Sequence, residues 1–176
     1  MINHNSKKVM MRKAILPTAV ILSVCSIVLM AVALTSGNGK KKDAIFTPPP
    51  FDAAAQSGVP EVDASLGWSE VYQDGMSFRA YVCGNVLVHG DRADVWFTNC
   101  EGFPVWLKLR ILDSDGNLLG ETGLLKPGEY VQSVILTSDV TDGQSIKLKI
   151  MAYEPDTYYS AGTATLNTVI TKGDAG

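Results

Sequence analysis

Histidine is scarce in this sequence, and its scarcity excludes several kinds of active site. Only two histidines occur in 176 residues, His4 near the N-terminus and His89 in the body of the chain. A serine triad needs a histidine beside its nucleophile, and no Gly-x-Ser-x-Gly turn accompanies His89. Asp91 and Asp94 resemble a carboxylate pair, but acids on an acidic surface ordinarily only solvate it. We therefore expect no catalytic residues and no enzyme activity.

Cysteine is equally scarce, with three in the chain. Two of them together with His89 fall short of a zinc set, and no glycine-rich loop follows a strand and opens a helix to hold phosphate. Residues 113–117 (DSDGN) alternate oxygen side chains as a calcium loop does. Their glycine comes two residues early for an EF-hand, position twelve is Leu124, and Asp-Gly and Gly-Asn steps also make hairpin turns. We favour a turn over a cation site, and expect neither metal nor other cofactor.

Positive charge is scarce in the larger, C-terminal part of the chain. From Glu61 onward, eight Lys and Arg stand against sixteen Asp and Glu, a net charge of −8, whereas the whole chain carries −3. Proteins that bind nucleic acid place Lys and Arg against phosphates. Nucleic-acid binding is therefore excluded.

The N-terminal part has the long apolar run that the rest lacks. Four basic residues precede it (Lys7, Lys8, Arg12 and Lys13), it extends from Ala14 to Leu34, and Lys40, Lys41 and Lys42 follow. About 20 residues cross the roughly 30 Å hydrocarbon core as a helix, and basic residues favour the cytoplasmic side. We expect a cytoplasmic segment at 1–13 and a transmembrane anchor at 14–35. The chain then spans the cell membrane once, with its C-terminal domain extracytoplasmic.

Two other readings of the N-terminal run stay open. Residues 31–33 (AVA) form a site of the kind cleaved in signal peptides, which would make the protein secreted, although the run is longer than usual for them. Lipidation at Cys25 is less favoured, because Val24 is not small and the apolar run continues beyond it. Residues 36–60, with three consecutive prolines at 48–50, are predicted to be a flexible linker that holds the domain away from the membrane.

Period-two alternation of apolar residues marks residues 61–172 as a β domain, followed by a tail at 173–176. Alternation over such runs is typical of strands buried on one face, and Gly-, Asp- and Pro-containing turns separate them. The predicted fold is an all-β, antiparallel immunoglobulin-like sandwich of seven or eight strands. The inward-facing residues are expected to be Met76, Phe78, Ala80, Val82, Val95, Phe97, Val105, Leu107, Leu109, Ile111, Ile146, Leu148 and Ile150.

A disulfide is expected between Cys83 and Cys100. If the hairpin between them turns at Asp91 and Arg92, the two cysteines lie directly opposite each other, within disulfide reach. The bond would stabilise an extracytoplasmic domain by about 3 kcal/mol. Two free buried thiols are the alternative.

Two groups of residues are candidates for binding. Trp106, Lys108 and Arg110 face outward on one predicted strand, and would form a basic stripe if that strand pairs with the one carrying Lys147, Lys149 and Met151. Aromatic residues with Arg mark protein interfaces, although the plain alternative is a solvated sheet face. Tyr153, Tyr158 and Tyr159 belong to a tyrosine-rich loop, and such a surface suits protein or glycan.

The run from Asp94 to Lys172 resembles a largely uncharacterised family of small bitopic envelope proteins of Gram-positive bacteria. Residues 123–128 (GLLKPG) match that family's Gly-Leu-Ile-x-Pro-Gly turn. Asn99-Cys100 stands in place of its Asn-Pro, and Ala161-Gly162 in place of its Asn-Gly. The resemblance implies a β-sandwich behind an N-terminal anchor and assigns no catalytic residues.

Together these features predict a membrane-anchored, non-enzymatic interaction or assembly module of a bacterial cell envelope. Its expected partners are the membrane and an envelope protein. The alternative function is a module that binds cell-wall glycan through Trp106 or the tyrosines.

Overall fold

The computed structural model describes residues 46–72, 75 and 77–173. Residues 47–176 form one compact unit. The expected cytoplasmic segment (1–13), the anchor (14–35) and all of the expected tail (173–176) except Gly173 lie outside the described residues, so these expectations stay predictions. Within the described part of the chain, no helix has the length and apolar character needed to cross a membrane.

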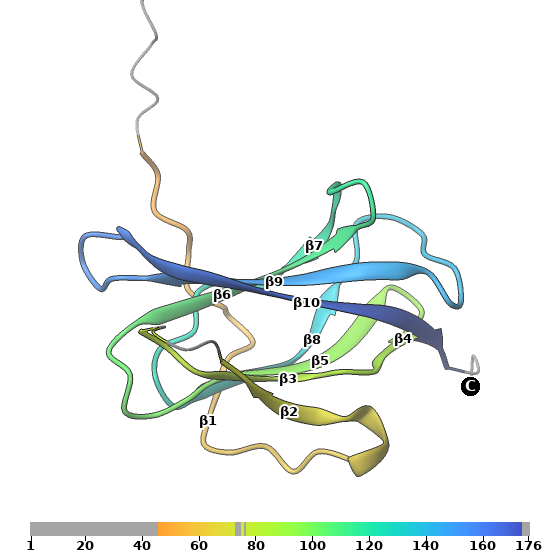
Figure 1. Ribbon diagram of the computed structural model, residues 1–176, viewed down its shortest axis with the longest axis horizontal. Helices are drawn as coiled ribbons and strands as arrows, with labels where there is room; N and C mark the ends of the chain where they lie inside the picture. The colour runs from red at the N-terminus through yellow and green to blue at the C-terminus, as the bar shows by residue number, and fades with distance from the viewer. Residues whose placement is uncertain (1–45, 73–74, 76, 174–176) are drawn as a thin grey trace, which may run out of the picture. The chain divides into compact units, whose positions relative to one another are not determined.

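Ten strands and one short 3₁₀ turn, η1 (Ala64–Leu66), make up the described unit (Figure 1). The strands are β1 (Gln56–Ser57), β2 (Trp68–Val71), β3 (Ala80–Cys83), β4 (Val86–His89), β5 (Arg92–Asn99), β6 (Trp106–Asp113), β7 (Leu118–Glu121), β8 (Glu129–Ile135), β9 (Ser145–Tyr153) and β10 (Ser160–Lys172). The prediction of an all-β domain is confirmed.

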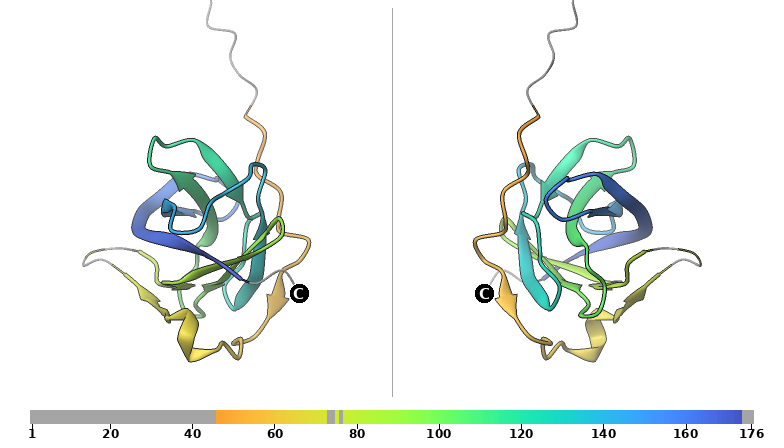
Figure 2. Two further views of the ribbon diagram at one scale, coloured as in Figure 1. Left: turned by 90° about the vertical axis from the view of Figure 1, so that its right-hand side faces the viewer. Right: turned by 90° about the vertical axis from the view of Figure 1, so that its left-hand side faces the viewer.

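The strands form one continuous sheet that curls around its core, as the end-on views of Figure 2 show. Its order is β1-β8-β5-β4-β10-β9-β6-β7, with β3 also pairing β5, and β2 flanking β3. Neighbouring strands are antiparallel except β10 and β4, which pair in parallel over Ile170–Lys172. The sheet is therefore mixed, whereas the sequence predicted a purely antiparallel one.

One hydrophobic core fills the curl, with residues from both halves of the sheet. Leu107, Leu109 and Ile111 on β6 face Ile146, Leu148 and Ile150 on β9 along the same inner surface, all at most 1% exposed. Every predicted inward-facing residue that the structure describes is buried. Alternation along a strand thus identified correctly which face packs inside.

A segment assigned to the linker packs against the sheet instead. We call residues 47–58 the strap; it runs down one side of the unit to β1 (orange in Figure 1). The Leu124 N–H donates to the Pro50 carbonyl (2.9 Å), the Asp52 N–H donates to the Leu124 carbonyl (3.0 Å), and β1 then pairs with β8. Hydrogen bonds to two strand regions fix the strap, so the chain becomes part of the domain well before residue 61.

Candidate functional site

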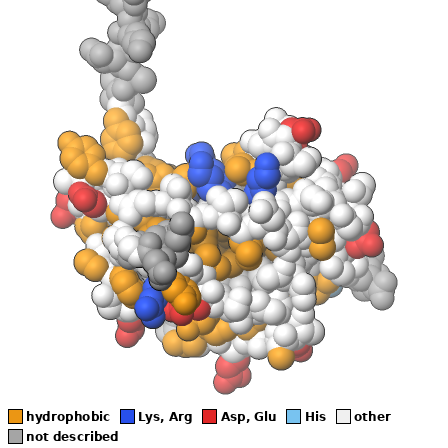
Figure 3. Space-filling model, viewed as in Figure 1, with side chains coloured by type: hydrophobic (Ala, Val, Ile, Leu, Met, Phe, Trp, Pro, Cys, Tyr) orange, Lys and Arg blue, Asp and Glu red, His pale blue; other side chains and the backbone are white. Residues whose placement is uncertain are grey.

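The predicted stripe lies on the outer face of β6 and β9, which pair as expected. Trp106 stands opposite Tyr153, Lys108 opposite Met151, and Arg110 opposite Lys149. Cross-strand partners share a face of the sheet. Figure 3 shows Lys and Arg side chains gathered over this part of the surface, with acidic side chains mostly around its margin.

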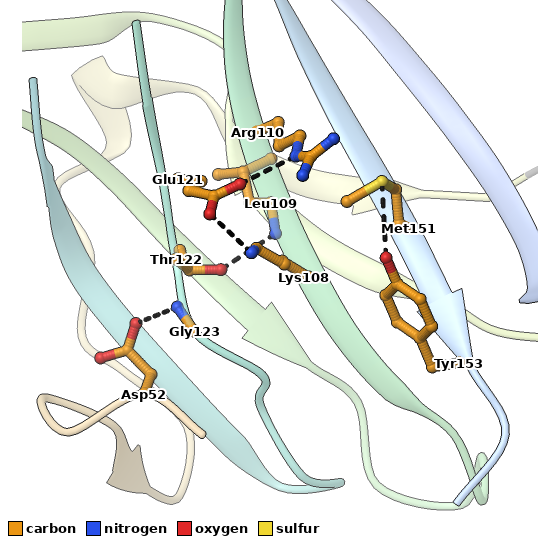
Figure 4. Close-up of polar contacts among 9 residues, drawn as sticks. All are labelled: Asp52, Lys108, Leu109, Arg110, Glu121, Thr122, Gly123, Met151 and Tyr153. Atoms are coloured by element: carbon orange, nitrogen blue, oxygen red, sulfur yellow. Dashed lines mark hydrogen bonds and ion pairs between the residues drawn. The ribbon is translucent and has the colours of Figure 1, made fainter. Parts of the chain in front are cut away.

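Two cations of the basic stripe, Lys108 and Arg110, share one carboxylate within the protein. The Lys108 ammonium donates to Glu121 Oε1 (2.7 Å), and Arg110 Nε donates to Glu121 Oε2 (2.8 Å), so one carboxylate pairs with both cations (Figure 4). Lys108 is only 5% exposed. The expectation of an exposed lysine in a contact face is therefore wrong, because β7 brings Glu121 beside β6.

Glu121 carries the electrostatic consequence of this arrangement. Partial burial raises the pKa of its carboxyl group, but the hydrogen bonds and positive charges of Lys108 and Arg110 outweigh burial and hold that pKa below its usual value. The carboxylate therefore remains ionised under physiological conditions. The three side chains form one ion-pair network that stabilises the β6–β7 pair and withdraws the Lys108 charge from a partner.

The aromatic end of the predicted site is also occupied by the chain itself. The Trp106 ring makes edge-to-face contacts with Phe51 of the strap (centroids 4.8 Å apart) and with Tyr158 (5.2 Å). The Lys126 ammonium lies 4.9 Å from the centre of the Phe51 ring. Trp106, Tyr158 and Phe51 thus serve first to dock the strap on the domain, a role that the linker assignment could not reveal.

Tyr153 and Tyr159 have different surroundings. The Tyr153 hydroxyl donates to the sulfur of Met151 (3.8 Å), beside the buried Lys108 (Figure 4). Tyr159 is 71% exposed. The loop holds its shape through the Tyr158 N–H donating to the Glu154 carbonyl and the Glu154 N–H donating to the Tyr159 carbonyl. Of the predicted tyrosines, Tyr159 is the one most accessible to a ligand.

The segment 113–117 is built as a turn. Asp113 Oδ1 accepts from the Asn117 backbone N–H (2.8 Å), and Oδ2 accepts from the Asn117 side-chain amide (2.7 Å). These bonds hold the pKa of Asp113 below its usual value. Among the described residues, no group of three or more His, Cys, Asp or Glu is placed to hold a metal ion.

The predicted disulfide is not formed, since Cys83 and Cys100 are both free. The hairpin turns at Gly90 and Asp91, pairing His89 with Arg92, and β3 meets β5 in the register Ala80 to Asn99. In that register the position opposite Cys100 is residue 79, four residues from Cys83. Four strand residues span about 13 Å, well beyond the reach of a disulfide. Burial raises the pKa of both thiols, that of Cys83 to about 12.

A second surface, on the opposite half of the sheet, was missed by the sequence analysis. Tyr81, Thr98 and Tyr130 stand in one row across β3, β5 and β8, and therefore share the outer face. The Trp68 ring stacks on Tyr81 (centroids 4.5 Å, planes 26° apart), and Trp96 stacks on Tyr130 (6.1 Å, 23°). Four half-buried rings thus line this face without belonging to the core.

A pocket of about 310 Å³ opens beside the Trp68–Tyr81 pair. Its other walls come from Gly58 at the end of the strap, from the following Val59, from Gly128, from the end of β5 at Thr98 and Asn99, and from Cys100 and Glu101 just after β5. We call this the Trp68 pocket. Alternation alone placed Tyr81 and Trp96 outward, but the pairing of β2 with β3 and of β5 with β8, which brings the rings together, is not readable from the sequence.

Comparisons with known proteins add little. No protein-family model matches the chain, and no curated protein matches it. Among solved structures, it is similar to the crystal structure of CopC from Methylosinus trichosporium OB3b, with 16% sequence identity and a TM-score of 0.33 over 55% of this chain and 98% of that one. A TM-score of this size does not establish a common fold, so the function has to be inferred from the chain's own residues.

Proposed function

We propose that this chain is a non-enzymatic interaction module of a bacterial cell envelope. Residues 14–35 anchor it in the membrane, and the β unit is presented outside, where it contacts an envelope protein. The observation that carries the proposal is the Trp68 pocket with its stacked Trp68–Tyr81 pair. Aromatic side chains in pockets on a sheet surface are typical anchors of protein interfaces.

The surroundings of the cysteine, histidine and acidic side chains support a binding role over catalysis. His89 and Asp94 lie on adjacent strands, and the charge of Asp94 reaches Cys83. Burial and that charge raise the pKa of Cys83 to about 12, so its thiol stays protonated. A protonated, fully buried thiol is a poor nucleophile, and this grouping does not constitute a cysteine–histidine site.

The tether and the finer fold class belong to the same proposal. A curled sheet whose two halves enclose one core is compatible with an immunoglobulin-like sandwich, and the turn at residues 123–128 supports membership of the anchored Gram-positive family. In this turn Leu124 and Leu125 are fully buried, and Gly128 has a positive φ of 78°. The turn therefore has a structural role in this fold.

A pull-down from detergent-solubilised native membranes tests the function. The full-length tagged protein is compared with Tyr81→Ala, which opens the Trp68 pocket, and with Tyr159→Ala, a matched variant on the other half of the sheet. We expect an envelope protein to co-purify in stoichiometric amount with the wild type and Tyr159→Ala, and to be lost with Tyr81→Ala. Thermal unfolding of each variant checks that the fold persists.

Two results would contradict this assignment. If no protein co-purifies with any of the three baits, the interaction module is refuted. If the partner is lost with Tyr159→Ala and kept with Tyr81→Ala, the contact lies on the loop after β9 and the Trp68 pocket is not the site.

Binding of cell-wall glycan remains the second candidate because of one residue. Tyr159 is 71% exposed, and it follows Tyr158 of the Trp106 cluster, so its ring face is available for a sugar. Sedimentation with purified cell walls tests this function. Wild-type protein that sediments, with Tyr159→Ala left in solution and Tyr81→Ala unaffected, would favour glycan over a protein partner.

A further inference from the structure

The Trp68 pocket has one formal charge among its lining residues, and that charge is negative. Glu101 is exposed at its rim, and makes no hydrogen bond or ion pair with any other described residue. Its side chain lies over Gly128, where an added Cβ would be 3.0 Å from Oε1. No Lys or Arg lines the pocket. The unit around it carries a net charge of −8 from Glu61 onward, which attracts cations at long range.

Two of the side-chain donors at the pocket, on Trp68 and Thr98, are used within the protein. The Trp68 indole N–H donates to the Trp96 carbonyl (2.8 Å), and the Thr98 hydroxyl donates to the same carbonyl (3.2 Å). What remains is the charged acceptor of Glu101, the Tyr81 hydroxyl, which can donate or accept, and the aromatic faces. The only formal charge at the pocket is therefore that of an acceptor, and it matches a ligand that brings donors and positive charge.

Arg79, the cation directly before β3, interacts with other residues of the protein. Arg79 precedes β3, pairs with Glu70 at 3.5 Å, and lies over the rings of Tyr72 and Phe103 at 5.4 and 5.9 Å from their centres. Arg79 therefore forms its ion pair with Glu70 and not with Glu101. On the same half of the sheet, the Arg79 guanidinium pairs with a carboxylate and contacts aromatic rings at the same time.

We propose that the Trp68 pocket receives an arginine side chain of a partner polypeptide. The guanidinium stacks against the Trp68–Tyr81 pair and donates to the Glu101 carboxylate, a combination for which a planar, forked cation is better suited than lysine. A volume of about 310 Å³ is at the small end for ligand sites and suits one side chain. This inference rests on the proposed interaction function and names the anchoring group of its partner.

A peptide titration tests the inference separately from the pull-down. The full chain in detergent micelles is titrated with Ac-Gly-Arg-Gly-NH2, and with Ac-Gly-citrulline-Gly-NH2, whose side chain is an uncharged analogue of arginine. Binding is followed by the NMR signal of the Trp68 indole N–H, assigned with Trp68→Phe. We expect saturable shifts of that signal and at least tenfold weaker binding of the citrulline peptide.

Two variants locate the charge that is recognised. Glu101→Gln is expected to reduce affinity for the arginine peptide about tenfold, whereas Asp139→Asn, which removes an exposed carboxylate from the loop after β8 and outside the pocket lining, leaves it unchanged. Each of three results would overturn the inference. The two peptides could bind equally, or the arginine peptide could shift the Trp106 signal and not that of Trp68. A soluble cell-wall saccharide could also shift the Trp68 signal while the arginine peptide does not. A partner lost with Tyr81→Ala despite such a result would leave the interaction function intact and refute only arginine recognition.

Discussion

At the scale of single residues, the sequence shows which way a side chain points but not what lies over it. Alternation correctly placed Lys108 outside the core, on the face opposite Leu107 and Leu109. Its partner Glu121 is thirteen residues away and arrives through the β6–β7 pairing, and Met151 approaches from β9. Tertiary neighbours therefore turned a predicted contact residue into a buried ion pair.

The ion-pair network makes an asymmetric prediction. Glu121→Gln leaves the Lys108 ammonium buried without a full counter-charge, so we expect a loss of about 1–3 kcal/mol in the free energy of unfolding. Lys108→Met replaces the buried cation by an apolar chain beside Met151 and leaves Glu121 paired with Arg110. That variant should be as stable as the wild type or slightly more stable. Urea unfolding of the full chain in detergent measures both values.

The control for the Glu121 and Lys108 variants is Glu61→Gln, an exposed site where a change within about 0.5 kcal/mol in the free energy of unfolding is expected.

The lowered pKa of Glu121 adds a pH dependence to the stability. Because its pKa is lowered on folding, its stabilisation is present above the unfolded-state pKa and is lost as the pH falls through the folded-state pKa. The gap between wild type and Glu121→Gln should therefore shrink on acidification. A gap that is constant between pH 6 and pH 3 would contradict the ion-pair account.

At the scale of elements, strands were easier to predict than their registers. The alternating runs around residues 105–112 and 146–151 correspond to β6 and β9. The cysteine pairing failed because Cys83 lies on β3 and not on the hairpin strand β4, and β3 meets β5 four positions away from the expected register. An irregularity between Asp94 and Phe97, where Trp96 has a positive φ of 43°, is a further local feature that alternation does not encode.

The strap is the other element that sequence composition misassigned. Its prolines and alanines have no apolar period, yet Phe51 and Asp52 supply specific contacts. Asp52 Oδ2 accepts from the Gly123 N–H at 2.7 Å, and no side chain at residue 123 separates the two backbones (Figure 4). One aromatic ring and a few backbone hydrogen bonds suffice to dock a segment that lacks any strand pattern of its own.

Gly123→Ala is predicted to release the strap. An added Cβ would lie 2.7 Å from the carbonyl carbon of Phe51, a backbone contact that cannot give way without moving the strap. We expect faster hydrogen exchange at the backbone amides of Asp52 and Gly58, and a loss of about 1–3 kcal/mol in the free energy of unfolding. Phe51→Ala should produce a smaller increase in exchange, because it removes the ring contact with Trp106 and keeps the backbone bonds.

Val59→Ala is the matched control for the strap variants, since this side chain is 81% exposed. Exchange in residues 47–58 should be unchanged by it. If Gly123→Ala leaves exchange at Asp52 and Gly58 as slow as in the wild type, the close approach of the strap to Gly123 does not hold the segment in place.

At the scale of the whole molecule, period-two alternation predicted the all-β class, while the aromatic surface around Trp68 came from strand pairing. Trp68, Tyr81, Trp96 and Tyr130 lie on four different strands. Each is an ordinary half-buried aromatic when taken alone. The curl of the sheet and the β2–β3 and β5–β8 pairings make them one surface, and an unaligned sequence contains no signal for those long-range pairings.

The membrane assignment is the prediction that decides where this surface acts. An uncharged run of about 20 residues with basic flanks is long enough to remain as an anchor, whereas a signal peptide would be removed after residues 31–33. Protein extracted from native membranes should therefore have the mass of the whole 18.9 kDa chain. Protease added to intact cells should remove the β unit and spare a cytoplasmic marker, because the basic residues at 7–13 orient the domain outward. A membrane-extracted product that begins after residue 33 would show that the segment is a cleaved signal and not an anchor. A β unit that is protected from protease until the cells are broken would show the opposite orientation, in which no envelope partner outside the membrane can reach the Trp68 pocket.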